Sequence, residues 1–207
     1  MNTLWMVLAV AAAYLVGSLA GSLMLARVFG QADLRTQGSG NAGATNALRT
    51  GGRGYGAAVL VFDLLKGVIA ALLIPALFGV GPAVAFACGA AAVVGHVYPV
   101  FFSFRGGKGA ATLIGVLLSL VPGALLLGLA VWIAALVASG YVGLATVVGM
   151  LGVALACLFA PAATFAAKVF VCAMTLLIFY THRDNIRRMR AGTENRFARA
   201  MLWRRGS

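Results

Sequence analysis

Long, nearly uncharged apolar runs recur along almost the whole chain and restrict its fold more than any other feature. Only 10% of the 207 residues are charged and 62% are hydrophobic, whereas soluble domains carry about 25% charged residues. The first run, residues 4–26, is too long for a signal-peptide core and has no basic residue before it. Apolar runs of this length span bilayers as helices. The sequence therefore predicts an all-α, polytopic membrane helical bundle that forms one domain over residues 1–207.

Basic residues gather in three polar segments and predict the topology. Most of the 16 Lys and Arg residues lie in segments 27–54, 102–109 and 181–207, and the alternate connections carry no charge. The positive-inside rule places all three segments and the C-terminus in the cytoplasm, with the N-terminus outside. Topology thus explains much of the net charge of +12 without nucleic acid. The remaining charge is available to anionic lipid or an anionic substrate.

The number of spans depends on how the last apolar region is divided. Pro- and Gly-bearing breaks at 121–123, 139–140 and 160–162 divide the last apolar region into four segments. Four crossings there predict seven transmembrane helices in all. The segment before Pro122 is short for a full crossing, however, and two longer crossings would give five helices with the same topology.

The first polar segment holds the stretch SGNAGATNALR, which is rich in small residues, hydroxyls and amides. Such a stretch can surround a polyoxygenated anion with backbone and side-chain donors. An ordinary glycine-rich loop is the alternative. The candidate binding residues here are Gly38, Gly40, Asn41, Thr45 and Asn46.

The second polar segment follows the stretch GHVYPVFFSF and contains RGGKG. Successive glycines let backbone N–H groups approach an anion, and the helix that follows directs its positive end at the same place. Near a helix end, His96 is suited either to a substrate or to an ordinary polar contact. The candidate phosphate-binding residues are His96, Arg105, Gly106, Gly107 and Gly109.

Within a predicted span, Asp63 and Lys66 are three residues apart and share one helix face. Ionisable residues inside a span are costly, so we expect a pair that supports the site without taking part in the chemistry. Neither histidine has zinc-ligand spacing and the three cysteines lie in apolar runs, so no metal and no cofactor are expected. The sequence offers no Ser-His-Asp order and no paired carboxylates. Catalysis should therefore depend on positioning and electrostatics.

The third polar segment begins with THRDNIRRMRAGTE, directly after the last apolar run. Its basic residues suit an interfacial membrane anchor. An anchor does not need the Asn and the Glu, which favours a functional role.

Together the three segments closely resemble the bacterial membrane acyltransferases that transfer a fatty acyl group from acyl-phosphate to glycerol 3-phosphate, the PlsY family. The resemblance lies in SGNAGATN…LR, GHVYPVFFSFRGGKGAAT and HRDNI…GTE, in this order from residue 38 to residue 194. It implies a seven-span bundle with its active site at the cytoplasmic face of the bacterial inner membrane. It also implies a structural role for Glu194 and catalytic roles for Ser39, Arg49, Lys108, His182 and Asn185.

The resemblance further implies that the products are lysophosphatidic acid and inorganic phosphate, the first acylation step of phospholipid synthesis. The expected partners are the two substrates, the bilayer and a soluble enzyme that makes acyl-phosphate. Because no base adjoins Ser39 in the sequence, we expect direct attack by the glycerol 1-hydroxyl without an acyl-enzyme. A phosphate or lipid-phosphate transporter is the alternative, although transporter sites usually lie at the midplane between repeats. A structural scaffold would not need three such loops.

Overall fold

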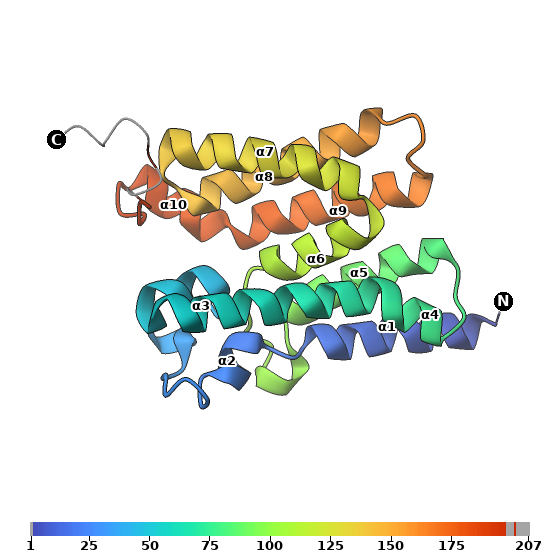
Figure 1. Cartoon of the computed structure of the whole chain (residues 1–207), viewed down its shortest axis with the longest axis horizontal. Coiled ribbons are helices and arrows are strands. Elements are labelled where there is room, and N and C mark those ends of the chain that lie inside the picture. Colours follow the sequence, from blue (N-terminus) through green and yellow to red (C-terminus); the bar gives the residue numbers. More distant parts are fainter. Residues whose placement is uncertain (1, 198–200, 202–207) are drawn as a thin grey trace. The chain divides into compact units, whose positions relative to one another are not determined.

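The computed structural model describes residues 2–197 and 201, and every regular element within them is a helix (Figure 1). The chain divides into two compact units, residues 1–120 and 121–207. The elements of the first unit are α1 (Thr3–Gly17), α2 (Gly21–Leu25), the 3-10 turn η1 (Leu34–Thr36), α3 (Ala44–Val68), the π-turn η2 (Ile69–Leu73), α4 (Ile74–Leu77), α5 (Pro82–Val97), the 3-10 turn η3 (Val100–Phe102) and α6 (Ala110–Leu120). The elements of the second unit are α7 (Pro122–Ser139), α8 (Val142–Phe159), α9 (Phe165–Thr181) and α10 (Arg183–Arg190).

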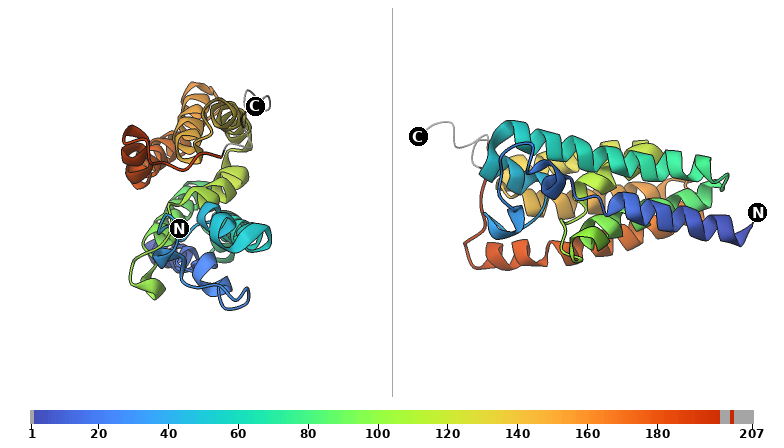
Figure 2. Two further views of the ribbon diagram at one scale, coloured as in Figure 1. Left: turned by 90° about the vertical axis from the view of Figure 1, so that its left-hand side faces the viewer. Right: turned by 90° about the horizontal axis from the view of Figure 1, so that it is seen from below.

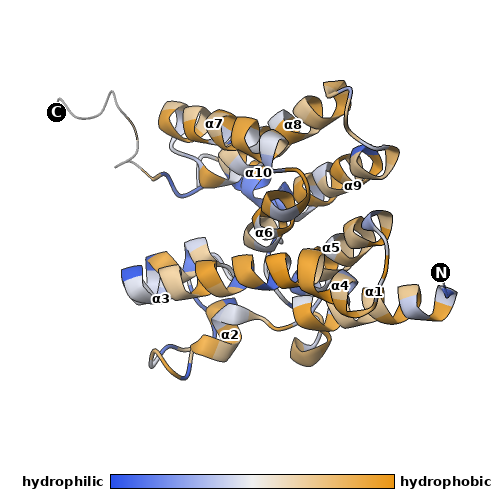
Figure 3. Ribbon diagram, turned by 45° about the vertical axis from the view of Figure 1, so that its right-hand side comes forward, coloured by the Kyte–Doolittle hydropathy of each residue, from blue (hydrophilic) through white to orange (hydrophobic). Residues whose placement is uncertain are grey.

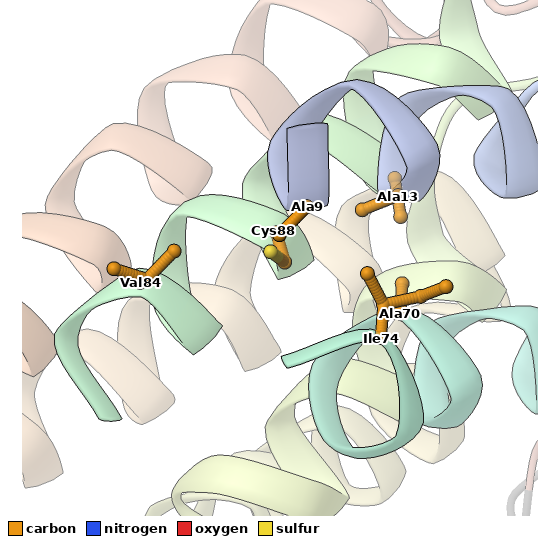
Figure 4. Close-up of a cluster of buried hydrophobic side chains, with 7 residues drawn as sticks. Ala9, Ala13, Ala70, Ile74, Val84 and Cys88 are labelled. Atoms are coloured by element: carbon orange, nitrogen blue, oxygen red, sulfur yellow. The ribbon is translucent and has the colours of Figure 1, made fainter. Parts of the chain in front are cut away.

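The first apolar run is broken, in contrast to the continuous span expected over residues 4–26. Helix α1 ends at Gly17, and Ala20 has an extended backbone with ψ 100° before α2 begins. The break lies where α1 meets α5, because a Cβ on Gly17 would overlap the carbonyl oxygen of Ala92. The small residues of this run therefore allow the two helices to pack closely. Small buried side chains such as Ala13 and Cys88 continue the same core (Figure 4).

Helix α3 consists of two limbs joined at Gly52, whose backbone is not helical (φ +82°, ψ −176°). The left-handed φ suits glycine. The short limb, residues 44–51, folds back on the long limb, since a Cβ on Gly56 would lie 2.7 Å from Cα of Leu48. This kink lies close to residue 54, the predicted end of the first polar segment. That segment gathers at one end of α3 (Figure 2).

The long limb of α3 continues through η2 into α4. Pro75 lies in the first turn of α4. Proline lacks the N–H that would bond four residues back, so its presence explains the π-turn before it. The combined segment Ala44–Leu77 is 34 residues long and strongly apolar.

Within the described residues, four helical segments are long and apolar enough to cross a membrane, or five if the bent pair of α9 and α10 counts as one span. The four helices expected between residues 110 and 180 are confirmed as α6 to α9, with breaks at the predicted positions. Helix α6 has 11 residues, in agreement with the short segment expected before Pro122, and α1 is also a shorter apolar helix, of 15 residues. Seven crossings would require both of them to cross. That number and the orientation of the termini stay predictions.

In the second unit, α7 and α8 pack closely through Gly128 and Gly149, whose Cβ atoms would meet the partner helix. The opposite side of α7 leaves large apolar side chains exposed, among them Leu126 and Ile133. Exposed apolar surface of this kind suits contact with lipid. Hydrophilic residues concentrate at α10 and at the end of α3 that carries its short limb (Figure 3). Part of the predicted third segment, residues 198–200 and 202–207, lies outside the described residues.

Candidate functional site

The loop that carries Ser39 is organised by a single buried side chain, Asn46 in the first turn of α3. Its Oδ1 accepts a 3.0 Å hydrogen bond from the backbone N–H of Ser39. Its Nδ2 donates to the carbonyl oxygens of Leu34 at 3.2 Å and Gln37 at 2.9 Å. Asn46 is only 1% exposed. This candidate binding residue therefore lies in α3, and its side-chain amide fixes the loop backbone around Ser39.

Asp33 and Arg35 connect the first polar segment to the second. Arg35 donates to Asp33 through Nε at 3.0 Å and Nη2 at 2.6 Å, and its Nη1 donates to the carbonyl of Phe102 at 3.1 Å. Hydrogen bonds from Arg35 hold the pKa of the Asp33 carboxyl below its ordinary value. This pair was not among the residues predicted from the sequence. An Asp and an Arg two residues apart before a glycine-rich loop are only a weak signal.

The glycine turn, residues 106–109, folds back on the end of α5. The N–H of Gly106 donates to the carbonyl of Val97 and the N–H of Gly107 to that of His96, each at 3.1 Å. This differs from the expectation that the glycine amides converge on an anion, because both N–H groups are used to hold the turn. The first N–H groups of α6, which begins at Ala110, have no partner within the helix. They become the candidate backbone donors of this segment.

The first and second polar segments meet at the glycine turn. A Cβ on Gly107 would lie 3.0 Å from the carbonyl oxygen of Ala42. Ala42 directly precedes Gly43, the N-cap of α3, and Gly107 lies just before α6. The N-terminal ends of two helices are thus brought close together, and both carry partial positive charge. Lys108 lies between Gly107 and the start of α6, and its side chain is half-buried.

The remaining candidates of the first unit lie around these loops. Arg49 is exposed on the short limb of α3, and Arg105 is exposed at the start of the glycine turn. The N–H of Gly40 donates to the carbonyl of Gln37 at 2.9 Å, and the carbonyl of Asn41 accepts from Gly43 at 2.9 Å. Thr45 is half-buried in the first turn of α3. Polar side chains therefore lie in the sequence near the starts of both α3 and α6.

Asp63, Lys66 and His96 lie together inside the first unit. Nζ of Lys66 is 3.0 Å from Oδ1 of Asp63, which confirms the expected pair. Nδ1 of His96 is 3.5 Å from the same oxygen. All three side chains are buried, with exposures of 0% for Asp63 and 3% for the other two. His96 therefore lies beneath the glycine turn rather than at the surface.

The third segment lies in the second unit, where α9 and α10 meet at a 47° bend. At this bend His182 Nδ1 is 2.9 Å from the carbonyl of Ile178, which favours the tautomer with a proton on Nδ1. Asn185 donates to Oε1 of Glu194 at 2.7 Å, and Arg188 donates to Oε2 at 2.6 Å. Glu194 is thus a buried acceptor that orients both side chains.

A chain whose described elements are all helices, several of them apolar and of membrane length, belongs to the class of integral membrane proteins. Comparison with known proteins gives the family. Residues 7–192 match the family described as "Glycerol-3-phosphate acyltransferase", and the chain belongs to this family. The match confirms the resemblance found in the sequence and makes the protein an enzyme, a membrane acyltransferase.

Relatives with the name glycerol-3-phosphate acyltransferase include a protein of Rhizobium meliloti (strain 1021), 46% identical over 88% of each chain. Another, from Aquifex aeolicus (strain VF5), is 42% identical over 89% of this chain and 95% of its own. The structure is similar to the crystal structure of the integral membrane acyltransferase PlsY in its glycerol 3-phosphate form, with a TM-score of 0.85. That match has 40% identity and covers 93% of this chain and 95% of that one. The lysophosphatidic acid form gives a TM-score of 0.84 at 36% identity, over 94% of this chain and 97% of that one.

Proposed function

We propose that this protein transfers a fatty acyl group from acyl-phosphate to the 1-hydroxyl of glycerol 3-phosphate and releases lysophosphatidic acid and inorganic phosphate. The observation that carries the proposal is the meeting of two helix N-terminal ends at Ala42 and Gly107, beside Lys108. The similar crystal structures contain glycerol 3-phosphate in one case and lysophosphatidic acid in the other, which are the proposed substrate and product.

Phosphate recognition falls to groups of positive charge or partial positive charge in the first unit. The N-terminal ends of α3 and α6 attract anions through their dipoles and through first-turn N–H groups that the helix itself does not bond. Lys108 adds a full charge next to α6, and Arg49 adds another on the short limb of α3. Because both substrates carry phosphate, we assign these groups to holding the phosphates and to stabilising the charge that develops on the leaving phosphate.

The chemistry we propose is direct transfer. The glycerol 1-hydroxyl oxygen forms a bond to the acyl carbonyl carbon, and the bond from that carbon to the phosphate oxygen breaks. The departing phosphate takes the proton of the hydroxyl and leaves as inorganic phosphate. In the described part of the chain no hydrogen bond joins Ser39 Oγ to a basic side chain, so an activated serine nucleophile lacks support. Ser39 instead positions a substrate from a loop that Asn46 fixes.

We further propose catalytic roles for His182 and Asn185 in the third segment, with Glu194 orienting Asn185. The proposed setting is the bacterial inner membrane, with seven crossings and all three polar segments in the cytoplasm. The charge pattern of the sequence supports this topology. A soluble enzyme that makes acyl-phosphate is the partner that such a donor requires.

The test uses the purified protein in detergent or a lipidic phase with labelled glycerol 3-phosphate and either acyl-phosphate or acyl-CoA. We expect lysophosphatidic acid and inorganic phosphate in equal amounts, with acyl-phosphate only. Formation of product with acyl-CoA alone would contradict the proposed donor, and a trapped acyl-Ser39 would contradict direct transfer. Uptake into vesicles without acylated product would instead indicate a transporter.

Lys108→Ala tests the assignment of the glycine turn. We expect loss of most activity while the protein stays folded, because a phosphate loses its nearest full positive charge on this segment. Lys168→Ala removes a lysine from α9 in the other unit and serves as the matched control. A near-normal rate for Lys108→Ala would remove this residue from the site.

A further inference from the structure

We propose that Asp63, Lys66 and His96 form a buried positioning network that sets the place of the glycine turn and so the phosphate affinity of the site. The proposal rests on the proposed function, in which the turn and Lys108 hold a phosphate. It assigns the three residues no contact with substrate. Their effect passes through the backbone of Gly107.

The network joins α3, α5 and the break between α1 and α2, which are distant in the sequence. Oδ1 of Asp63 lies 3.0 Å from Nζ of Lys66 and 3.5 Å from Nδ1 of His96. Nζ of Lys66 also donates a 2.8 Å hydrogen bond to the carbonyl of Leu19. Neither carboxylate oxygen of Asp63 makes a hydrogen bond in the described part of the chain, and nor does Nδ1 of His96. The contacts at Oδ1 are therefore electrostatic, and they hold the carboxylate in place.

Burial makes a purely stabilising role a poor explanation for this network. Charges that are taken out of water are costly, and apolar residues of similar volume often stabilise a core at least as well as a buried ion pair. Ionisable groups inside membrane helices are usually functional for the same reason. The network fixes the relative positions of its side chains through directional polar contacts. An apolar core would not supply such contacts.

His96 transmits this geometry to the turn through two of its groups. Its carbonyl accepts the N–H of Gly107 at 3.1 Å. Its ring faces the same residue, since a Cβ on Gly107 would overlap Nε2 of His96. Asp63 contacts the opposite nitrogen, Nδ1, and so sets the rotation of the ring against Gly107.

The other side of Gly107 is fixed from the first polar segment. The carbonyl of Ala42 lies 3.0 Å from where a Cβ on Gly107 would be. The carbonyl of Ala42 accepts a 3.1 Å hydrogen bond from Oγ of Ser22 in α2. Helix α2 begins just after the break between α1 and α2, where the carbonyl of Leu19 is free of the helix and accepts from Lys66. The backbone of Gly107 is therefore held between His96 and Ala42. The contact with His96 belongs to the network itself, because His96 is one of its members. The contact with Ala42 depends on Ser22, which follows the break where Lys66 binds Leu19.

The residue after Gly107 is Lys108, and α6 begins two residues later. A shift of Gly107 would displace both the ammonium group and the N–H groups of the helix start. Displacements of about 1 Å can change rates by about 100-fold when they misplace a reacting group. Loss of the network should thus weaken phosphate binding even if the fold persists.

The experiment compares His96→Leu, His96→Asn and His96→Gln with the wild-type protein. Two readouts are used, the KM for glycerol 3-phosphate and the concentration of inorganic phosphate that gives half-maximal thermal stabilisation. For His96→Leu we expect both to rise by about 10-fold or more. An Asn side chain places an N–H where Nδ1 stood and can still face Asp63, whereas Gln places its N–H nearer to Nε2. We therefore expect His96→Asn to recover most of the phosphate affinity and His96→Gln to recover less.

Cys88→Ala is the matched control, because Cys88 is fully buried in the same helix as His96 and packs in the apolar cluster that contains Ala9 and Ala92. It should leave both phosphate readouts unchanged. If His96→Leu or His96→Gln lowers the melting temperature but keeps the wild-type phosphate dependence, the network supports only the fold and the proposal is overturned. Equal recovery by Gln and Asn would also overturn it, and this comparison holds even if the Leu variant does not fold.

Thermal stabilisation by inorganic phosphate tests this proposal independently of the proposed function, because it requires no acyl transfer. A wild-type protein that makes no lysophosphatidic acid from acyl-phosphate would overturn the proposed function. The phosphate stabilisation of the same preparation would still show whether the His96 variants shift the binding of an anion at the turn.

Discussion

The backbone N–H of Ser39 donates a 3.0 Å hydrogen bond to the side-chain amide of Asn46, seven residues further along the chain. The same amide binds the carbonyls of Leu34 and Gln37. One buried side chain thus determines the path of the loop from Leu34 to Ser39. The place of the Ser39 hydroxyl depends on it.

Asn46→Asp should lower kcat/KM strongly, by about 100-fold. The new carboxylate can still accept from Ser39, but it sets an oxygen against two carbonyl oxygens and leaves them without their donor. Each unsatisfied buried group costs about 1–3 kcal/mol, so the melting temperature should fall as well. Acyltransfer kinetics and thermal unfolding measure the two effects. Asn195→Asp makes the same change at an exposed position and should alter neither. Wild-type kinetics in Asn46→Asp would show that the loop does not depend on this amide.

Gly106→Ala should disrupt the glycine turn from within. A Cβ there would overlap the carbonyl oxygen of His96 and lie 2.7 Å from Cδ of Pro99. Neither a backbone oxygen nor a proline ring can move aside easily, so we expect the free energy of unfolding to fall by about 1–3 kcal/mol. The initial rate should fall by more than the loss of folded protein can explain, because Lys108 follows the turn and would be displaced with it. Denaturant unfolding and initial rates check both parts.

Gly123→Ala is the control for this change, because no atom lies within 4 Å of its Cβ position in the first turn of α7. Alanine in place of a helical glycine should leave activity intact and raise stability by about 0.4–1 kcal/mol. Equal losses for the two variants would mean that the crowding at Gly106 has no effect of its own.

Local signals in the sequence predicted part of this structure well. Pro122 and Gly140 end or begin helices at the expected places, because proline and glycine act through their own backbone. The Asp63–Lys66 pair followed from their spacing on one helix. Such features depend on a few neighbouring residues, and those are visible in the chain.

Features that depend on distant residues could not be predicted. The break after Gly17 coincides with close packing against Ala92, and nothing in the run itself marks it. The sequence offered Asn46 and the glycine amides as anion donors, yet the fold uses them to hold loops. The contact of His96 with Asp63 joins residues that are far apart in the chain. Donor groups are identifiable from residue type, but their partners are set by tertiary structure.

Glu194→Gln and Glu194→Ala should affect the third segment to different degrees. Gln keeps an acceptor for Asn185 but loses the charge-assisted bond to Arg188, which is worth about 1.5–3 kcal/mol. Ala removes both partners and should abolish most activity, whereas Gln should retain part of it. Rates and melting temperatures of the two variants distinguish these outcomes. Asp184→Asn removes an exposed pair with Arg187, whose side chain is 81% exposed, and should change stability by less than about 1 kcal/mol. A larger loss in Gln than in Ala would contradict the orienting role of Glu194.

Acid should loosen the link between the first two polar segments through Asp33. Hydrogen bonds from Arg35 lower the pKa of this carboxyl, so the folded protein favours its ionised form. The resulting stability is fully present above the ordinary pKa of about 3.9 and is lost as the pH falls through the lowered value. Protonated Asp33 no longer holds Arg35, and the bond from Arg35 to the Phe102 carbonyl weakens with it.

Melting temperatures of the wild-type protein and of Asp33→Asn, recorded from neutral pH down to acid pH, test this link. The wild-type protein should be the more stable at neutral pH by a small margin, because the pair is partly exposed. The margin should stay constant above about pH 5 and shrink below about pH 4. Arg183→Gln, which removes an exposed arginine from the other unit, should show no such convergence with the wild-type protein. A margin that persists unchanged into strong acid would mean that Asp33 is not the group whose ionisation holds Arg35 against Phe102.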